Sequence, residues 1–413
     1  MRSWARPRRK DREVTSVGAR AAVILTRDVI PFWTGVVDEE HGGYRLNHDS
    51  AGRWRGPAEK FLVSQARTLW SFARLARVGL APREAADRGY RFLRDRMWDH
   101  RWGGFHWAVS HDGSRATADD KSICAQSLAL FALCEHAELT ADPAERSLCR
   151  DLFALLDGHA HDAAHGGYRE SFTREWDEPP PDDLGYFGSP PARKLFNVNL
   201  HVLEAVTSLV AMDGGDLPRR RLEELMGICG EVVLDPATGG CRNQFHEDWS
   251  PLTGPEHDRS SYGHDLENVA LLLAAAEAMG LEPGPLAQRC ATLTSHALTY
   301  GLDRAQGGFF ASGPLGRPAD RREKLYWTQA EGLLALLRMW QATRDPVYLE
   351  PLTLTLDWIE SRQVDRAGGD WHEDISPQGV PAGDKAWAWK DPYHQVRALL
   401  EARALVWREP PLA

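Results

Sequence analysis

The 413-residue chain carries a formal net charge of −10, with 43% hydrophobic and 26% charged residues. This composition suits a protein with a large core, and the negative charge argues against nucleic acid or an anionic membrane as a partner, since both require a basic surface. No run of about 18 apolar residues could span a membrane, and the basic segment 1–12 lacks the apolar centre of a signal peptide. We therefore expect a cytoplasmic protein.

The cysteines and tryptophans give two further indications, on the state of the thiols and on the kind of ligand. The six cysteines form no CxxC pair and lie mostly in apolar helical contexts, which predicts reduced thiols in the core. The 16 tryptophans exceed what a core of this size requires. Indole faces suit the apolar C–H patches of sugar rings, and the indole N–H can donate to a hydroxyl, although we expect most of these residues to fill the core.

Six of the Gly-Gly pairs in the chain, usually beside an aromatic residue, follow one another at intervals of 61 to 73 residues. The pairs begin at Gly42, Gly103, Gly166, Gly239, Gly307 and Gly368. Two adjacent glycines beside an extended aromatic or polar run are typical of a tight turn that opens a short hairpin. One such match would mean little, but six at nearly even spacing indicate an internal repeat.

Each expected hairpin lies between two expected helices. An amphipathic helix precedes the hairpin, as in residues 82–98, 143–157 and 346–362. A helix-start signal and a long apolar pattern at helical spacing follow it, as in residues 60–76, 121–137 and 393–405. Before the last of these, Asp391 can cap the helix and Pro392 fits its first turn, where the missing N–H costs nothing.

Six such units give twelve helices, which could form an open solenoid or a closed ring. The second helix of each unit is apolar over most of its surface, which suits an inner ring surrounded by outer helices, and closure buries both terminal units. We therefore predict an all-α fold, an (α/α)6 barrel whose short β-hairpins gather at one mouth and mark the active site. The barrel would form a single domain over residues 13–413, after a flexible basic segment 1–12.

Polar residues interrupt the apolar pattern of the expected inner helices. In the first, Arg67 lies among residues suited to a core, where a permanent cation needs an anionic or strongly polar partner. The third carries Asn197, His201 and Glu204 at i, i+4 and i+7, a stripe that would face a wet lumen. On this helix alone, a core histidine satisfied by hydrogen bonds is the open alternative.

The fourth inner helix opens with His264 and Glu267, one turn apart. Glu267 could orient an imidazole and raise its basicity, or it could act as a capping carboxylate for Ser260 or Ser261. His264 and His394 both lie near the start of a helix. The positive end of the helix dipole there predicts a lowered pKa for each imidazole and favours a neutral base.

The fifth and sixth inner helices complete the polar set. The fifth carries Trp327 and Glu331, again one turn apart, and Trp389 precedes His394 where the chain enters the sixth. Side chains from several helices of one ring would therefore converge on its lumen.

A metal or a cofactor is not predicted. The cluster of His159, His161 and His165 has a spacing that could hold zinc, but it lacks a carboxylate or cysteine at ligand spacing. HExxH, GxSxG, P-loop and GxGxxG motifs are absent from the sequence.

Five motifs in these helices resemble those of the N-acylglucosamine 2-epimerase superfamily, which includes cellobiose 2-epimerases, mannose 2-epimerases and mannose isomerases. They are SQARTLW, NVNLHVLEA, SYGHDLE, YWTQAE and WKDPYH, and the resemblance spans nearly the whole chain. It implies the same (α/α)6 barrel. SYGHDLE and WKDPYH are most similar to the cellobiose 2-epimerase branch, from which the third inner helix departs at Val198 and Asn199.

By this resemblance, His264 and His394 match the general acid/base pair, and the other matched positions bind the sugar, aid ring opening or stabilise charge. The resemblance thus implies a catalytic set of His264, His394, His201, Arg67 and Glu267. It implies sugar binding by Asn197, Trp327, Glu331 and Trp389. Trp389 matches a tryptophan that stacks against the sugar in the cellobiose branch.

The chemistry fits these residue types independently. Removing a proton from C2 of a sugar requires the open aldehyde, a base at C2 and charge stabilisation at O1 as an enediolate develops, which His264, His394 and Arg67 can supply. Return of the proton to the opposite face of C2 gives the epimer, and return to C1 gives a ketose. We predict 2-epimerisation of mannose, glucose or cellobiose, with mannose–fructose isomerisation as the main alternative.

Two other classes of function stay open. A glycoside hydrolase on the same barrel would need a carboxylate pair across the glycosidic bond, for which Glu267 and Glu331 are candidates. A sugar-binding or partner-binding module would keep the fold without turnover. The only partner we predict is a small sugar, bound by a monomer or a homodimer.

Overall fold

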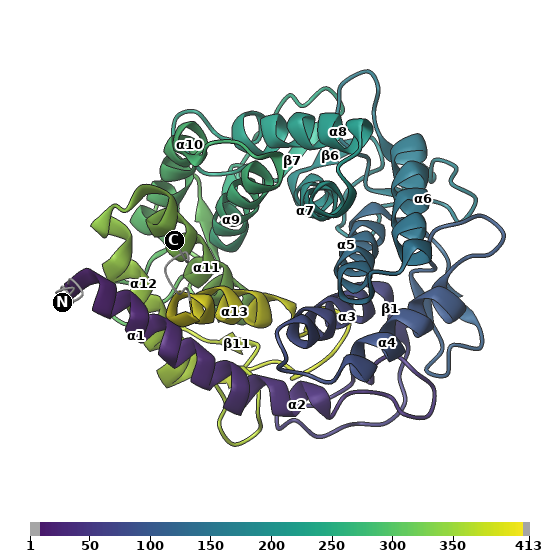
Figure 1. Cartoon of the computed structure of the whole chain (residues 1–413). Helices are drawn as coiled ribbons and strands as arrows, with labels where there is room; N and C mark the ends of the chain where they lie inside the picture. The colour runs from purple at the N-terminus through teal and green to yellow at the C-terminus, as the bar shows by residue number, and fades with distance from the viewer. Residues whose placement is uncertain (1–8, 408–413) are drawn as a thin grey trace, which may run out of the picture.

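The computed structural model describes residues 9–407 and arranges its helices as two concentric rings (Figure 1). The outer ring contains α1 (Arg9–Val23) with α2 (Ile30–Thr34), α4 (Arg83–Phe92), α6 (Pro143–Ala160), α8 (Asp216–Gly227), α10 (Pro283–His296) and α12 (Leu349–Trp358). The inner ring contains α3 (Leu62–Arg77), α5 (Ile123–Thr140), α7 (Phe196–Asp213), α9 (Tyr262–Met279), α11 (Tyr326–Thr343) and α13 (Tyr393–Trp407). The predicted (α/α)6 barrel is confirmed.

The ring closes where its first and last units meet. Helix α1 packs against α13, and Arg20 of α1 pairs with Asp357 at 2.6 Å and Glu360 at 2.7 Å. Of the segment predicted to be flexible, residues 1–8 lie outside the described part of the chain and residues 9–12 belong to α1. The apolar patches of both end units are therefore covered by each other, as a closed ring requires.

Short strands join neighbouring units at one end of the ring. The strands are β1 (Lys60–Phe61), β2 (Ala108–Val109), β3 (Ala116–Ala118), β4 (Lys121–Ser122), β5 (Ser171–Phe172), β6 (Arg193–Leu195), β7 (Gln244–His246), β8 (Arg259–Ser261), β9 (Ser312–Pro314), β10 (Lys324–Leu325), β11 (Asp374–Ile375) and β12 (Pro381–Ala382). The strand that leads into one inner helix pairs antiparallel with a strand of the next unit, as β1 does with β2 and β6 with β7. All inner helices therefore start at the same mouth.

Each Gly-Gly pair forms a tight turn, as predicted. An antiparallel bridge closes every turn, from Val37 with Tyr44 in the first unit to Val364 with Trp371 in the sixth. Gly43 adopts a φ of +66°, and a Cβ there would lie 2.6 Å from Oε1 of Gln65. A side chain at this position would be strained and would displace the hydrogen bonds described next.

A side chain of each inner helix fastens it to the hairpin of its own unit, and we call this the anchor position. Gln65 illustrates it: Oε1 accepts from the backbone N–H of Tyr44 at 2.9 Å, and Nε2 donates to the Tyr44 carbonyl at 2.8 Å. The six anchor positions are Gln65, Gln126, Asn199, Asp265, Gln329 and Gln395. Asn199, where the sequence departs from the cellobiose branch, is thus a hairpin anchor.

An ion pair, buried or largely buried, also recurs in every hairpin. The hairpin ion pairs are Lys60–Asp38, Lys121–Asp99, Lys194–Asp162, Arg242–Asp235, Lys324–Asp303 and Lys385–Asp365, with N···O distances of 2.7 to 3.1 Å. The aspartate also accepts backbone N–H groups of its turn, as Asp38 does from Glu40 and His41. These contacts satisfy buried polar groups and hold each turn in one conformation.

Three further expectations can be compared with the structure. All six cysteines are unpaired and buried, as predicted. Asp391 caps α13, since its Oδ1 accepts the backbone N–H of Tyr393 at 3.0 Å. Across residues 9–407, no helix combines the length and the apolar character that crossing a membrane would demand.

Candidate active site

The site residues occupy equivalent positions on the inner helices when each helix is counted from its anchor. Two residues after the anchor lie Arg67, Leu128, His201, Glu267, Glu331 and Arg397. One residue before it lie Ser64, Ala125, Val198, His264, Thr328 and His394. Two residues before it lie Val63, Cys124, Asn197, Gly263, Trp327 and Tyr393. Because the anchors fix each helix in the same way, these positions form layers around the lumen near the hairpin mouth.

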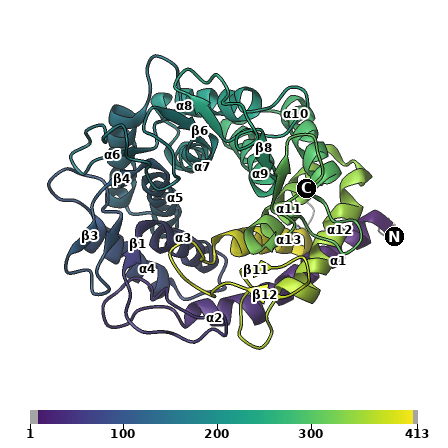
Figure 2. The same cartoon turned by 180° about the vertical axis from the view of Figure 1, so that it is seen from behind.

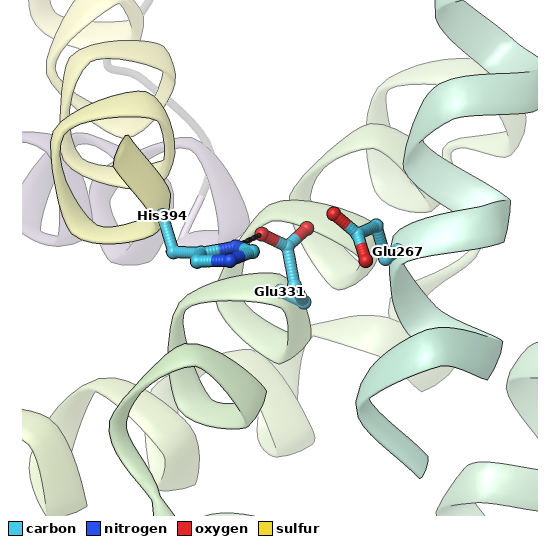
Figure 3. A group of neighbouring side chains, drawn as sticks. All are labelled: Glu267, Glu331 and His394. Atoms are coloured by element: carbon cyan, nitrogen blue, oxygen red, sulfur yellow. Dashed lines mark hydrogen bonds and ion pairs between the residues drawn. The ribbon is translucent and has the colours of Figure 1, made fainter. Parts of the chain in front are cut away.

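His394 belongs to a buried network of polar contacts, of which Figure 3 shows the contact with Glu331. Its Nδ1 lies 2.6 Å from Oε1 of Glu331, and the other oxygen of Glu331 accepts Nη2 of Arg397, also at 2.6 Å. A guanidinium only donates, so it favours an ionised Glu331, which in turn accepts a proton held on Nδ1. Nε2 of His394 is then the nitrogen with a free lone pair.

His201 is held in the same manner by different residues. Its Nδ1 lies 3.2 Å from Oε2 of Glu204, and its Nε2 lies 3.4 Å from Nη2 of Arg67. The second oxygen of Glu204 accepts from Arg397 at 2.6 Å and from the hydroxyl of Tyr393. Since Arg67 can only donate, Nδ1 of His201 carries its proton toward Glu204.

His264 and His394 meet at one indole. The ring centroid of Trp327 lies 4.9 Å from that of His264 and 5.7 Å from that of His394. Phe196 approaches His264 edge-on at 6.4 Å. The structure thus brings the predicted acid/base pair together around Trp327, from α9 and α13.

Burial keeps the three histidines neutral. Desolvation lowers the pKa of His264 to about 3, with the charges of His201 and Arg67 acting in the same direction. Desolvation is also the main reason for the lowered pKa of His394 and of His201, although Glu204 partly opposes it at His201. The predicted direction is right, but the main cause is burial in the lumen instead of the helix dipole.

Glu267 neither orients an imidazole nor caps its helix, the two roles that the sequence predicted. Its recorded partner is Arg397, whose Nη2 lies 3.4 Å from Oε1, whereas the imidazole–carboxylate pairs are His201–Glu204 and His394–Glu331. The capping alternative is also wrong, because Ser260 donates to Asp265. Burial, with repulsion from Glu331, raises the pKa of Glu267 to about 8. Glu267 is therefore mostly protonated at neutral pH and can donate a hydrogen bond.

Arg67, Asn197 and Trp389 are the remaining predicted residues, and each has its own surroundings. Arg67 is buried, with Nη1 3.9 Å from Oδ2 of Asp391. Within the described residues, Oδ1 of Asn197 is buried without a hydrogen-bond partner, a state that a hydroxyl ligand would relieve. The Trp389 ring lies 5.9 Å from the rings of both Trp107 and Phe187.

Arg397 and Tyr393 are the residues that the sequence reasoning missed. Arg397 pairs with Glu204, Glu267 and Glu331 and stacks 4.5 Å above the ring of Tyr393. In the sequence Arg397 looks like an ordinary charge on a helix. The signal that could have found it is its position, since four of the other five residues in its layer had been selected.

Two groups could be considered for a metal ion. His161 bonds Glu224 at 2.9 Å, His165 lies 3.4 Å from Asp162, and His159 stacks on a tryptophan, so these three do not converge. Glu267, Glu331 and His394 do offer ligand atoms within 4.8 Å of one another. There, however, Nη2 of Arg397 already contacts both Glu331 and Glu267, and a cation would have to displace this guanidinium.

The comparisons with known proteins agree with this geometry. The family model for N-acylglucosamine 2-epimerase (GlcNAc 2-epimerase) matches residues 42–398. The chain belongs to this family. The predicted N-acylglucosamine 2-epimerase resemblance and the enzyme class, a carbohydrate epimerase or isomerase, are thereby confirmed.

Relatives within and around the N-acylglucosamine 2-epimerase family span almost the whole chain. The cellobiose 2-epimerase of Bacteroides fragilis is 29% identical over 387 residues, covering 91% of this chain and 96% of the relative. The solved cellobiose 2-epimerase of Spirochaeta thermophila has a TM-score of 0.87 at 29% identity and covers 97% of this chain and 99% of its own. The D-mannose isomerase of Marinomonas mediterranea is 24% identical over 382 residues, covering 88% and 91%.

Proposed function

We propose that this protein epimerises the reducing-end aldose of mannose, glucose or cellobiose at C2, without a metal or redox cofactor. One observation carries the proposal: two neutral imidazoles, His264 and His394, flank the same indole in a lumen that also holds a permanent cation. A neutral imidazole can serve as the base for proton abstraction beside a carbonyl. The similarity to cellobiose 2-epimerases supports the same activity.

The residues divide the steps of this reaction among them. Ring opening moves a proton from the O1 hydroxyl to the ring oxygen, for which neutral His201 is a base and protonated Glu267 an acid. One of His264 and His394 then removes the C2 proton, and electron density shifts to O1. Arg67 stabilises the resulting enediolate. Because both imidazoles start neutral, the proton returns to the opposite face of C2 in one of two ways: from the same imidazolium after the intermediate rotates, or from the second imidazole after it has received that proton.

Substrate binding falls to the remaining predicted residues. The unpaired Oδ1 of Asn197 can accept a sugar hydroxyl, and Trp327 packs between the two imidazoles. Trp389 presents an indole face for stacking. Glu331 acts through His394, because one oxygen holds Nδ1 and the other is held by Arg397.

Mannose–fructose isomerisation is the second candidate, favoured by the similarity to D-mannose isomerase. It shares every step up to the enediolate and differs in the carbon that receives the proton. Hydrolysis is disfavoured, because a nucleophilic carboxylate must be free to attack and Arg397 binds both Glu267 and Glu331.

The test is chromatography of the products formed from mannose, glucose and cellobiose. Glucose from mannose, or glucosylmannose from cellobiose, would support 2-epimerisation. Fructose from mannose would support the isomerase, and free glucose from cellobiose would support the hydrolase. Absence of any conversion, or full turnover by the His394→Ala variant, would contradict the proposed function.

A further inference from the structure

The barrel has a second opening, at the end opposite to the hairpins. A cavity of about 820 Å³ lies there between the second halves of all six inner helices, and we call it the rear cavity. Figures 1 and 2 view the ring from its two ends. The lining of the rear cavity includes the six residues that lie five positions after the anchors, namely Trp70, Phe131, Glu204, Ala270, Leu334 and Leu400.

The rear cavity reaches inward to Glu204 and Arg397. Both residues also belong to the charged contacts of the candidate active site. Nη1 of Arg397 lies 2.6 Å from Glu204, while Nη2 lies 2.6 Å from Glu331 and 3.4 Å from Glu267. A single guanidinium therefore lies between the hairpin-side lumen and the rear cavity, and it contacts three buried carboxyl groups.

Two of these carboxylates hold the histidines. The oxygens that Arg397 leaves free bind Nδ1 of His201 on Glu204 and Nδ1 of His394 on Glu331. If Glu331 were protonated, its O–H would donate to Nδ1 of His394. The imidazole proton would then move to Nε2, and the nitrogen facing the lumen could no longer accept one.

We infer that Arg397 is a positioning residue: it keeps Glu204 and Glu331 ionised, so that His201 and His394 carry their proton on Nδ1 and leave Nε2 unprotonated. The inference rests on the proposed function. Arg397 needs no contact with the sugar to act, because it works through the two carboxylates. The groups that face this cluster from the six inner helices are Arg67, Cys124, His201, Glu204, His264, Glu267, Glu331, Asp391, Tyr393 and His394.

The test is the Arg397→Ala variant. We expect kcat to fall about 10²-fold with little change in KM, because the base is in the wrong tautomer while the sugar contacts remain. Without the cation, the buried carboxylates that hold the histidines lose the positive charge that stabilises their ionised form. The acidic limb of the kcat–pH profile should therefore move to higher pH, and the loss of activity should be smaller at pH 9 than at pH 6.

The rear cavity gives this variant a specific signature. Guanidinium ion at non-denaturing concentration should enter from the rear and restore part of kcat, and it should not compete with the sugar. If guanidinium ion also rescues Arg67→Ala, it should compete with the sugar, because the Arg67 side chain that it would replace lies at the proposed sugar site. Arg338→Ala is the matched control, because Arg338 lines the same cavity but pairs with Glu401 at 3.2 Å, and its activity and pH profile should be unchanged.

Several results would overturn the inference. These are an unshifted pH profile in folded Arg397→Ala, an effect confined to KM, or rescue that competes with the sugar. If Arg397→Ala does not fold, the test uses Arg397→Lys, since one ammonium cannot bridge three carboxyl groups. A wild-type pH profile in Arg397→Lys would also contradict the inference.

A readout without substrate separates this inference from the proposed function. In ¹⁵N-labelled wild-type protein, His394 should show a downfield proton on Nδ1 that is lost in the Arg397 variant. If wild-type protein converts no sugar, the proposed function fails while this resonance still decides the role of Arg397. If wild-type protein is active and the resonance is unaffected by the substitution, only the role of Arg397 is wrong.

Discussion

Buried ion pairs occur both in the hairpins and in the lumen, and the two regions differ in whether their charged residues repeat from one unit to the next. In the hairpins, an aspartate pairs with a basic residue in all six units, and in four of them this residue is a lysine five positions before the anchor, as Lys60–Asp38 and Lys324–Asp303 illustrate. In the lumen, each unit contributes a different residue at the equivalent position, from Arg67 on α3 to Arg397 on α13. The difference teaches that repeated buried charges hold this fold together, whereas buried charges that break the repeat carry its chemistry.

The largest expected effect lies in the lumen. His394→Ala should lower turnover roughly 10³–10⁴-fold, because it removes an acid/base group. It also leaves Oε1 of Glu331 without the N–H donor that His394 supplies. Its unfolding midpoint should change far less than its activity. Steady-state assays and thermal unfolding check both. A stable variant with wild-type turnover would break the comparison.

The hairpins should respond in the opposite way. Lys60→Met removes one partner of a buried pair and should lower the free energy of unfolding by about 3–5 kcal/mol, while kcat per folded molecule stays the same. Denaturant titration measures the loss. Adding Asp38→Asn to it removes the unpaired charge but keeps the backbone hydrogen bonds of the turn, so the double variant should recover part of the stability.

Glu267 sharpens the comparison, because it should affect both activity and stability. Glu267→Gln should lower kcat about 10²-fold by removing the acid. In wild-type protein the folded state keeps this proton up to about pH 8, whereas the unfolded state loses it near pH 4.5. Wild-type stability is therefore lost as pH rises through this window.

The Gln variant has no such proton to retain. The difference in free energy of unfolding between the Gln variant and wild-type protein should therefore shift in favour of the variant as pH rises from 4.5 to 8. Above pH 8 this difference should stay constant. Denaturant titrations at pH 5 and pH 9 would show this. An equal difference at both pH values would mean that Glu267 has an ordinary pKa in the folded protein.

The smallest effect is expected at the sugar-stacking position. Trp389→Ala should raise KM for the sugar about tenfold with less change in kcat, since stacking contributes on the order of 1 kcal/mol. Trp54→Ala is the control, because this indole is 46% exposed and belongs to the first hairpin region. Equal KM changes in the two variants would argue against a sugar contact by Trp389.

The sequence was sufficient for the ring and for most of the lumen. The Gly-Gly repeat and the apolar second helices predict the barrel because hairpin turns and burial are local, periodic properties. Partners across the ring are not local. The sequence predicts that Glu267 orients an imidazole or caps its own helix, yet its partner in the structure is Arg397 on α13.

Arg397 was missed for the same reason. A charged residue on a helix is usually solvated, and only the closed ring places Arg397 against carboxylates that lie 66 to 193 residues earlier in the chain. The histidine pKa values show the same limit. Their direction could be predicted from helix position, but their main cause, desolvation, depends on side chains from several units.

Ring closure also ties activity to the folding mechanism. Arg20 reaches Glu360 across 340 residues of chain, and α1 rests on the helix that carries His394 and Arg397. Such distant contacts form late, because a long loop must close before they add stability. A refolding molecule with five units in place would resemble the native barrel by circular dichroism yet lack a base. Recovery of turnover should therefore lag behind recovery of helix, and the lag would time the joining of the two ends.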